Sequence, residues 1–268
     1  MTLPQTLWLI GCGNMAGAML RRWVAAGAVR GADVFVLNRR EQELPEGVRQ
    51  GRVLPDGALP DAVMLGVKPQ QIDDVAGHVA SRIAGVKLLV SILAGVEEDV
   101  LAARFDARAI VRAMPNLPVE IGKGVVALHS DGAGAEARAA VEALMAPLGL
   151  VEWVGAAQFD AVAALAGSGP AFVYRFIDAL AAAGAAVGLP VEQALRLALA
   201  TVEGGALLAA QSADTPAALA DKVASPGGST REGLNVLDKD EALTRLLIET
   251  LAAAVRRNGE MAAAARGS

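Results

Sequence analysis

The stretch Leu7-Trp8-Leu9-Ile10 runs directly into Gly11-Cys12-Gly13-Asn14-Met15-Ala16 near the N-terminus, and it decides the fold. The four apolar residues predict a buried strand, and the apolar periodicity that follows predicts a helix. A G-x-G-x-x-A turn between a strand and a helix is typical of dinucleotide binding. In such a turn Gly11 permits the tight bend, Gly13 lets the backbone approach a pyrophosphate, and Ala16 allows close packing of helix on strand.

The start of that helix offers free N–H groups and the positive end of the helix dipole to phosphates. We therefore expect Gly11, Gly13, Asn14 and Met15 to contact a dinucleotide. A tight strand–helix turn without a ligand is the alternative. Cys12 is interpreted as a small residue of the turn.

The end of the next apolar strand bears on the choice of nicotinamide cofactor. An NAD site usually has an acidic residue there for the ribose 2′-hydroxyl, whereas this chain has Asn38-Arg39-Arg40. Asn38 can hydrogen-bond the ribose, and the guanidinium groups of Arg39 and Arg40 suit a 2′-phosphate. The residues favour NADPH, with NADH as the alternative; a solvated basic turn without a ligand is the other interpretation.

Short apolar runs alternate with helical patterns throughout the first half of the chain. Alternation of this kind predicts an α/β Rossmann-type fold, with a doubly wound, mainly parallel sheet and helices on both faces. We assign residues 1–157 to this domain. The strands are expected at 7–10, 34–37, 62–67, 88–92, 110–113, 125–128 and 151–154, and the helices at 15–26, 70–83, 97–105 and 135–147.

Further polar or small residues follow three later strands of this predicted sheet. Ligands bind at the carboxyl ends of strands in such sheets. We therefore expect cofactor contacts from Val67, Lys68 and Pro69, from Ala94 and Gly95, and from Asn116. Lys68 has an alternative interpretation as a surface residue at a helix start.

The second half shows helical patterns and no convincing strand. We assign residues 158–268 to an all-α domain for dimerisation and substrate binding. Its run 171–187 is apolar on nearly every face, and such helices are buried. A domain of this size has little surface of its own to bury the run, so we expect an obligate homo-oligomer built on these helices; a monomeric helical cap is the alternative.

The segment Ser225-Pro226-Gly227-Gly228-Ser229-Thr230 interrupts the helical pattern of this second domain. Successive N–H groups beside a helix start form a cradle for an anion, here suited to a carboxylate. We expect Gly227, Gly228, Ser229 and Thr230 to bind such a group. The alternative is a simple helix–helix connector.

Composition excludes several classes of protein. The 268 residues are 54% hydrophobic with a net charge of −5, which excludes disorder and gives no electrostatic case for nucleic acid. One cysteine cannot form an internal disulfide. We see no signal peptide and no uninterrupted apolar span, so we expect a cytoplasmic protein without membrane contact. His78 and His129 lie in no motif; we expect both to be structural or solvent-facing, and no metal site.

Taken together, these motifs resemble pyrroline-5-carboxylate reductase over nearly the whole chain. The matching stretches include Gly11 to Met15, Val67-Lys68-Pro69-Gln70, Ala94-Gly95, Met114-Pro115-Asn116-Leu117-Pro118 and Gly167 to Phe172. The long match from Val223 to Leu234 is highly specific to that family. Leu117 departs from the pattern, because the family usually carries Thr there and Leu changes the polarity near the nicotinamide pocket.

The resemblance implies reduction of 1-pyrroline-5-carboxylate to L-proline by hydride transfer to the cyclic imine. It further implies a dimer of intertwined C-terminal helices, often assembled into a ring of dimers, with the Ser225–Thr230 loop supplied by the partner subunit. The N–H groups of Ser229 and Thr230 would hold the substrate carboxylate. The Thr230 hydroxyl would hydrogen-bond the ring nitrogen, with Ser225 or a water assisting.

Two rival functions fit parts of the sequence. A β-hydroxyacid dehydrogenase shares the two-domain plan but needs a Lys as general acid shortly after a Gly-rich segment. Here Gly167-Ser168-Gly169 is followed by no such Lys, and the second half holds only Lys222 and Lys239. A non-catalytic NADPH-binding sensor would have no use for a carboxylate cradle.

Overall fold

In a computed structural model, which describes residues 3–266, the chain forms two compact units. The second unit is Gly169–Ala253, and the first unit contains the described residues before and after it. The division predicted from sequence lies earlier, between residues 157 and 158. The short helix α5 (Ala156–Val162) and the π-helical turn η5 (Ala163–Gly167) group with the first unit. The buried Phe159 of α5 and the contacts of η5 with the sheet explain this grouping.

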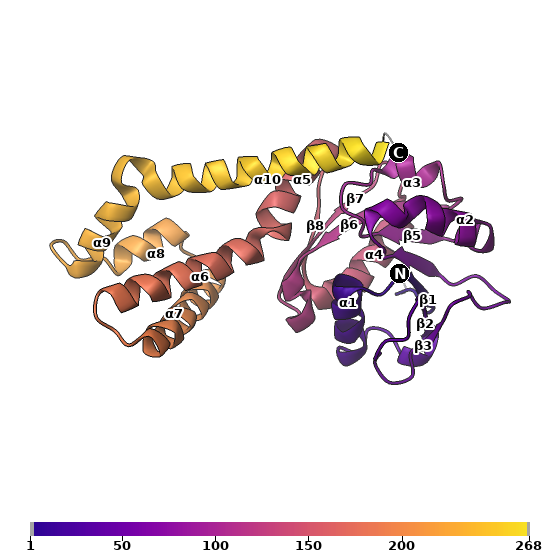
Figure 1. The fold of residues 1–268 in the computed structure, drawn as a ribbon, viewed down its shortest axis with the longest axis horizontal. Helices are drawn as coiled ribbons and strands as arrows, with labels where there is room; N and C mark the ends of the chain where they lie inside the picture. Colours follow the sequence, from indigo (N-terminus) through magenta and orange to yellow (C-terminus); the bar gives the residue numbers. More distant parts are fainter. Residues whose placement is uncertain (1–2, 267–268) are drawn as a thin grey trace. The chain divides into compact units, whose positions relative to one another are not determined.

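An eight-stranded sheet forms the centre of the first unit, in the order β3-β2-β1-β4-β5-β6-β7-β8 (Figure 1). Every neighbouring pair is parallel except β6 and β7, which are antiparallel. The expected mainly parallel α/β sheet is thus confirmed. The strands are β1 (Leu7–Ile10), β2 (Val34–Leu37), β3 (Arg49–Gly51), β4 (Ala62–Leu65), β5 (Leu88–Ser91), β6 (Ile110–Pro115), β7 (Gly124–His129) and β8 (Gly149–Trp153).

Two hydrophobic cores lie on opposite faces of this sheet. Successive side chains of a strand point to opposite faces, so Leu7 and Leu9 join one core while Trp8 and Ile10 join the other. Helices α1 (Asn14–Ala25) and α4 (Ala135–Met145) bury their apolar residues in the first core. Helices α2 (Ile72–Ile83) and α3 (Glu98–Ala102) bury theirs in the second. Helices on both faces of the sheet are therefore confirmed.

The three tryptophans of the chain all lie in the first unit, each fixed by a polar or charged neighbour. Trp23 is fully buried, and its indole Nε1 donates a hydrogen bond to Leu144 O at 2.6 Å. The guanidinium of Arg82 lies 4.8 Å from the Trp8 ring centroid, and that of Arg138 lies 4.1 Å from the Trp153 centroid. The only tyrosine, Tyr174, lies in the second unit and is largely exposed.

The structure adds β3 to the predicted strands and shortens several elements. β3 has the polar sequence Arg49-Gln50-Gly51 at the sheet edge, so no apolar run marks it. α3 covers Glu98–Ala102 rather than 97–105, and the predicted helix at 70–83 divides into the 3-10 turn η2 (Pro69–Gln71) and α2. β6 and β7 are longer than predicted.

The second unit is entirely helical in the described residues, as expected. Its elements are α6 (Gly169–Ala186), α7 (Val191–Gln211), α8 (Pro216–Lys222), α9 (Ser229–Asp238) and the first part of α10 (Ala242–Arg266). Its buried residues are few and small, as Ala181, Ala194 and Ala198 illustrate, whereas Phe176, Leu208 and many other large apolar side chains are exposed. Among the described helices, none is both long and apolar enough to span a membrane.

Candidate active site

The turn after β1 is held by close backbone packing that only glycine permits. Gly11 has φ +84°, and a Cβ atom there would lie 2.5 Å from Val67 Cγ1. A Cβ at Gly66 would lie 2.8 Å from Gly11 O and 2.9 Å from Ala16 Cβ. The turn is fixed further by Gly11 N donating to Leu37 O at 2.9 Å. The strand ends of β1, β2 and β4 therefore meet at this turn.

Gly13 occupies a different environment, on the open side of the same turn. It is the residue before α1, and a Cβ atom built on it would have no atom within 4 Å. Among the residues that the structure describes, no side chain caps the helix there. The first N–H groups of an α-helix have no partner within the helix, so Gly13, Asn14 and Met15 present free donors beside open space. This arrangement suits a pyrophosphate.

Asn38, directly after β2, has one end of its amide engaged and the other unpaired. Its Oδ1 accepts a hydrogen bond from Cys12 N at 3.0 Å, which ties β2 to the turn after β1. Its Nδ2 is buried and has no hydrogen-bond partner among the described residues. Buried donors are rarely left unsatisfied, so this group points to a ligand acceptor. The residues fit the ribose of a dinucleotide.

A cavity of about 770 Å³ opens at these strand ends. It contains Gly11, Gly13 and all three residues of the Asn38-Arg39-Arg40 turn, together with Val67 and Lys68. The structure thus brings together most of the predicted cofactor residues. The complete lining is Ile10, Gly11, Cys12, Gly13, Leu37, Asn38, Arg39, Arg40, Gln42, Arg52, Gly66, Val67, Lys68, Gln71, Asp74, Val75, His78 and Val79.

The lining also holds Arg52, Asp74 and His78, whose place at this cavity the sequence did not predict. Arg52 follows β3, whose polar sequence hid the strand. Asp74 lies in the first turn of α2 and forms a short ion pair with Arg39, and the His78 Nδ1 atom lies 2.6 Å from Asp74 O. Arg39 is therefore engaged within the protein, whereas Arg40 and Arg52 are further cations at the cavity. No local pattern marks the Arg39–Asp74 pair, because 35 positions separate its members.

Asn116 lies outside this cavity and serves the backbone. Its Nδ2 donates to Ala166 O at 2.9 Å, and its Oδ1 accepts from Val125 N at 2.8 Å. These bonds join the end of β6 to β7 and to η5. Pro69, Ala94 and Gly95 also lie outside the cavity lining. Gly95 has φ +73°, and a Cβ there would lie 3.3 Å from Ala262 N, so the close approach of α10 explains that glycine.

A second cavity of about 450 Å³ lies beside the first and shares Cys12, Gly13 and Gln42 with it. Asn14 and Leu117 contribute to its lining. Arg21 closes one side through a 3.0 Å ion pair with Glu120. Leu117, the residue that departs from the family pattern, therefore lies next to the Gly13 turn.

The loop before α9 belongs to the second unit. Gly228 N donates to Ser225 O at 2.9 Å, and Gly227 has φ +71° with no atom within 4 Å of a built Cβ. Gly228 precedes α9, no side chain caps that helix, and Ser229 and Thr230 are its exposed first residues. The loop and the start of α9 thus offer free N–H groups and two exposed hydroxyls, which is chemistry suited to a carboxylate.

Comparison with known proteins decides the family. Residues 156–261 match the family model described as pyrroline-5-carboxylate reductase dimerisation, and residues 6–95 match the model described as NADP oxidoreductase coenzyme F420-dependent. The pyrroline-5-carboxylate reductase of Synechocystis is 37% identical over 262 residues, which cover 95% of this chain and 97% of the relative. The chain belongs to the pyrroline-5-carboxylate reductase family.

Solved structures agree with this family assignment. A pyrroline-5-carboxylate reductase from Coxiella burnetii is 33% identical, with a TM-score of 0.88 over 96% of this chain and 98% of that one. The Plasmodium falciparum pyrroline carboxylate reductase, solved with NADP bound, has the same fold, with a TM-score of 0.83 over 97% of this chain and 100% of that one, at 24% identity. The α/β domain with a helical dimerisation domain is therefore the architecture of pyrroline-5-carboxylate reductases.

Proposed function

We propose that this member of the pyrroline-5-carboxylate reductase family reduces 1-pyrroline-5-carboxylate to L-proline with NADPH as hydride donor. The activity follows from the family membership. The choice of NADPH over NADH rests on this chain's own residues. The observation that carries the nucleotide assignment is the buried Asn38 Nδ2, which lacks a partner among the described residues and lies at the 770 Å³ cavity.

The charge around Asn38 supports NADPH over NADH. Arg39, Arg40 and Arg52 line the cavity, and Asp74 is the acidic residue among the lining side chains. Because Asp74 is paired with Arg39, Arg40 and Arg52 are the proposed partners of a 2′-phosphate. An arginine fork matches phosphate geometry. No acidic residue stands at the end of β2, where NAD sites usually place one.

The reaction requires mainly that the substrate be oriented toward the nicotinamide and that water be excluded. A protonated cyclic imine is already an electrophile, and the reduced nicotinamide supplies the hydride. In our proposal the backbone N–H groups of Ser229 and Thr230 hold the substrate carboxylate, with Gly227 and Gly228 shaping the loop. The Thr230 hydroxyl hydrogen-bonds the ring nitrogen and thereby fixes the imine carbon that receives the hydride; Ser225 lies beside it in the loop. Positioning of this kind can supply much of a barrier reduction.

The proposed active form is a homodimer joined through the C-terminal helices. The match to a dimerisation model over residues 156–261 and the exposed apolar side chains of the second unit support it. A ring of dimers and a cytoplasmic location stay predictions from the sequence. A β-hydroxyacid dehydrogenase is disfavoured by the missing Lys after Gly169 and by the family assignment.

The test is turnover by the purified chain with 1-pyrroline-5-carboxylate, followed by the loss of absorbance of the reduced cofactor and by the formation of proline. We expect turnover with both coenzymes and a higher kcat/KM with NADPH. If no proline forms with either coenzyme, the proposed activity is wrong. If kcat/KM with NADH equals or exceeds that with NADPH, the reductase activity stands but the preference for NADPH is wrong.

A further inference from the structure

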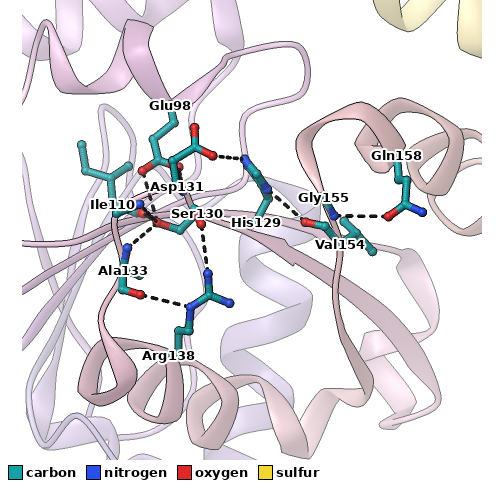
Figure 2. Close-up of polar contacts among 11 residues, drawn as sticks. Glu98, Ile110, His129, Ser130, Asp131, Ala133, Arg138, Val154, Gly155 and Gln158 are labelled. Carbon is teal, nitrogen blue, oxygen red and sulfur yellow. Dashed lines mark hydrogen bonds and ion pairs between the residues drawn. The ribbon is translucent and has the colours of Figure 1, made fainter.

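A cluster of three metal-ligating side chains lies apart from the cavity just described. Glu98 begins α3, His129 ends β7, and Asp131 follows in the loop before α4. Each offers one ligand atom, and these atoms lie within 4.8 Å of one another. Figure 2 shows the three side chains converging. None of them lines the cavity at Gly13 and Asn38.

The His129 ring is oriented as in many metal ligands, with one nitrogen bonded to the backbone and the other facing the cluster. The residue is 6% exposed, and its Nδ1 lies 3.0 Å from Val154 O (Figure 2). A carbonyl oxygen can only accept, so Nδ1 is the donor in this contact and Nε2 is the ring nitrogen that faces the cluster. Metal-ligating histidines almost always use their other nitrogen in this way.

His129 Nε2 faces the Asp131 carboxylate, and the two form an ion pair when the ring is protonated. Asp131 Oδ1 lies 3.5 Å from His129 Nε2, beyond the usual range of about 2.7–3.2 Å for a hydrogen bond. Two ligands of one tetrahedral Zn²⁺, at about 2.0–2.2 Å from the metal, lie about 3.4 Å apart. The observed separation therefore matches a pair of ligands on a shared ion.

Glu98 is held in place by the loop that carries Asp131. Its Oε2 accepts from Asp131 N at 2.9 Å. The Ser130 hydroxyl lies 2.6 Å from Ile110 O and 3.2 Å from Glu98 Oε1. A hydroxyl has one hydrogen, and the shorter contact to Ile110 O takes it. Each Glu98 oxygen thus has one neighbour in this loop, and a carboxylate oxygen has lone pairs for more than one partner.

The same loop is braced from the side by α4. Arg138 donates to Ser130 O at 3.1 Å and to Ala133 O at 3.0 Å, as Figure 2 shows. Ala133 N donates to Ser130 Oγ at 3.0 Å. These bonds fix the backbone on both sides of Asp131, so the ligand set is largely preorganised.

The surrounding charge favours a cation. Glu97, Asp99 and Asp160 join Glu98 around one buried guanidinium, that of Arg112, whose pKa is lowered by burial and raised by these acids. Arg112 stacks over Phe159 at 4.1 Å, and the Phe159 ring meets the His129 ring edge-on. Arg138 is a second cation beside this loop, and the carboxylates Glu97, Glu98, Asp99, Asp131 and Asp160 outnumber these two guanidinium groups.

We propose that Glu98, His129 and Asp131 bind one Zn²⁺ ion, with water completing the tetrahedron. One imidazole and two carboxylates form a donor set that Zn²⁺ accepts, and three protein ligands leave a fourth position open. The ion ties the start of α3 to the β7–α4 loop and stabilises the first unit. The site was not expected from sequence, because Glu98 is about thirty positions away from its partner ligands.

The test is titration of the metal-stripped full-length protein with Zn²⁺ by calorimetry, together with thermal unfolding with and without Zn²⁺. We expect one equivalent to bind and to raise Tm, since an ion that binds the folded state alone stabilises it. Asp131→Asn should weaken binding at least about tenfold, the lower end of the loss seen when even an outer-shell partner of a metal is removed. Its side chain is 80% exposed, so the fold should persist.

Two further variants sharpen the outcome. Glu98→Gln retains an oxygen that accepts the loop hydrogen bonds and should also weaken Zn²⁺ binding. His78→Asn is the matched control. It removes the other histidine of the chain, which lies on the exposed face of α2 at 3.6 Å from an Asp74 oxygen, and it should leave Zn²⁺ binding unchanged. Absence of binding by the native chain, equal binding by Asp131→Asn, or a loss in His78→Asn would each overturn the site.

Discussion

Asn38 shows how one amide can serve both the fold and a ligand. Its oxygen is committed to Cys12 N, and its nitrogen is buried without a described partner. An aspartate there could accept from Cys12 N but could not donate outward, and its charge would repel a 2′-phosphate. The proposed preference for NADPH therefore rests on this position and on the arginines that follow it.

The arginines give a prediction at the scale of single side chains. Replacing Arg39 and Arg40 together by Ala should raise KM for NADPH much more than KM for NADH, because only NADPH carries the 2′-phosphate. Loss of charge-assisted contacts worth about 1.5–3 kcal/mol each corresponds to at least tenfold. Steady-state kinetics with both coenzymes measure it, and an equal rise in both KM values would contradict the assignment.

Single variants then separate the two side chains. Arg39 is already paired with Asp74, whereas Arg40 has no described ion-pair partner. Arg40→Ala should therefore account for most of the loss. A larger effect from Arg39→Ala would show that the ion pair with Asp74 opens when the coenzyme binds.

Thr230 gives the second prediction at this scale. Thr230→Ala removes the hydroxyl proposed to bond the ring nitrogen and should lower kcat/KM by about one to two orders of magnitude. Thr230→Ser is the matched control, because it keeps the hydroxyl and should retain most of the activity. Unchanged kinetics in the alanine variant would show that the Thr230 hydroxyl takes no part in the reaction.

The two glycines of the turn between β1 and α1 give a prediction at the scale of a structural element. Gly11→Ala places a methyl group 2.5 Å from Val67 Cγ1 at positive φ and should lower the free energy of unfolding by about 2 kcal/mol or more. Gly13→Ala has φ −72° and open space around the new methyl group, so stability should be preserved while nucleotide binding is lost. Denaturant unfolding and coenzyme titration measure the two effects.

The opposite pattern would contradict this division of roles. If Gly13→Ala bound coenzyme normally, the open side of the turn would not be where the pyrophosphate lies. If Gly11→Ala were as stable as the native protein, the turn would tolerate a shift of Val67.

Sequence predicts most elements of the first unit because parallel strands are buried on both faces and read as apolar runs. β3 escapes prediction, since Arg49-Gln50-Gly51 is short, polar and at the edge. The roles of the turn residues Gly11, Gly13 and Asn38 could be predicted from the local sequence pattern alone. The engagement of Asn116 by Ala166 O could not be predicted, because 50 positions separate them and no pattern encodes the contact.

The exposed apolar side chains of the second unit give a prediction about the assembly of the whole molecule. Phe176 and Leu246 are at least half exposed in the single chain. Replacing both by Glu should shift the proposed dimer to monomer and greatly reduce activity, because burying charges at an interface is costly. Sedimentation velocity and turnover measure the two effects.

A control for this prediction comes from the first unit. Leu150 in β8 is 60% exposed and lies outside the residues that match the dimerisation model. Leu150→Glu should leave the oligomer intact, since charges are common on edge strands. Dissociation by Leu150→Glu, or an intact dimer in the double variant, would place the interface elsewhere.

The distribution of aromatic residues makes the two units optically distinguishable. Indole fluorescence comes only from Trp8, Trp23 and Trp153, all in the first unit, while Tyr174 is the sole phenol and lies in the second. During denaturation, tryptophan emission therefore reports the unfolding of the first unit. Circular dichroism also reports the unfolding of the helices, including those of the second unit. If subunits associate through the second unit, dilution should move the dichroism transition more than the fluorescence transition, so the unmodified protein carries its own pair of reporters.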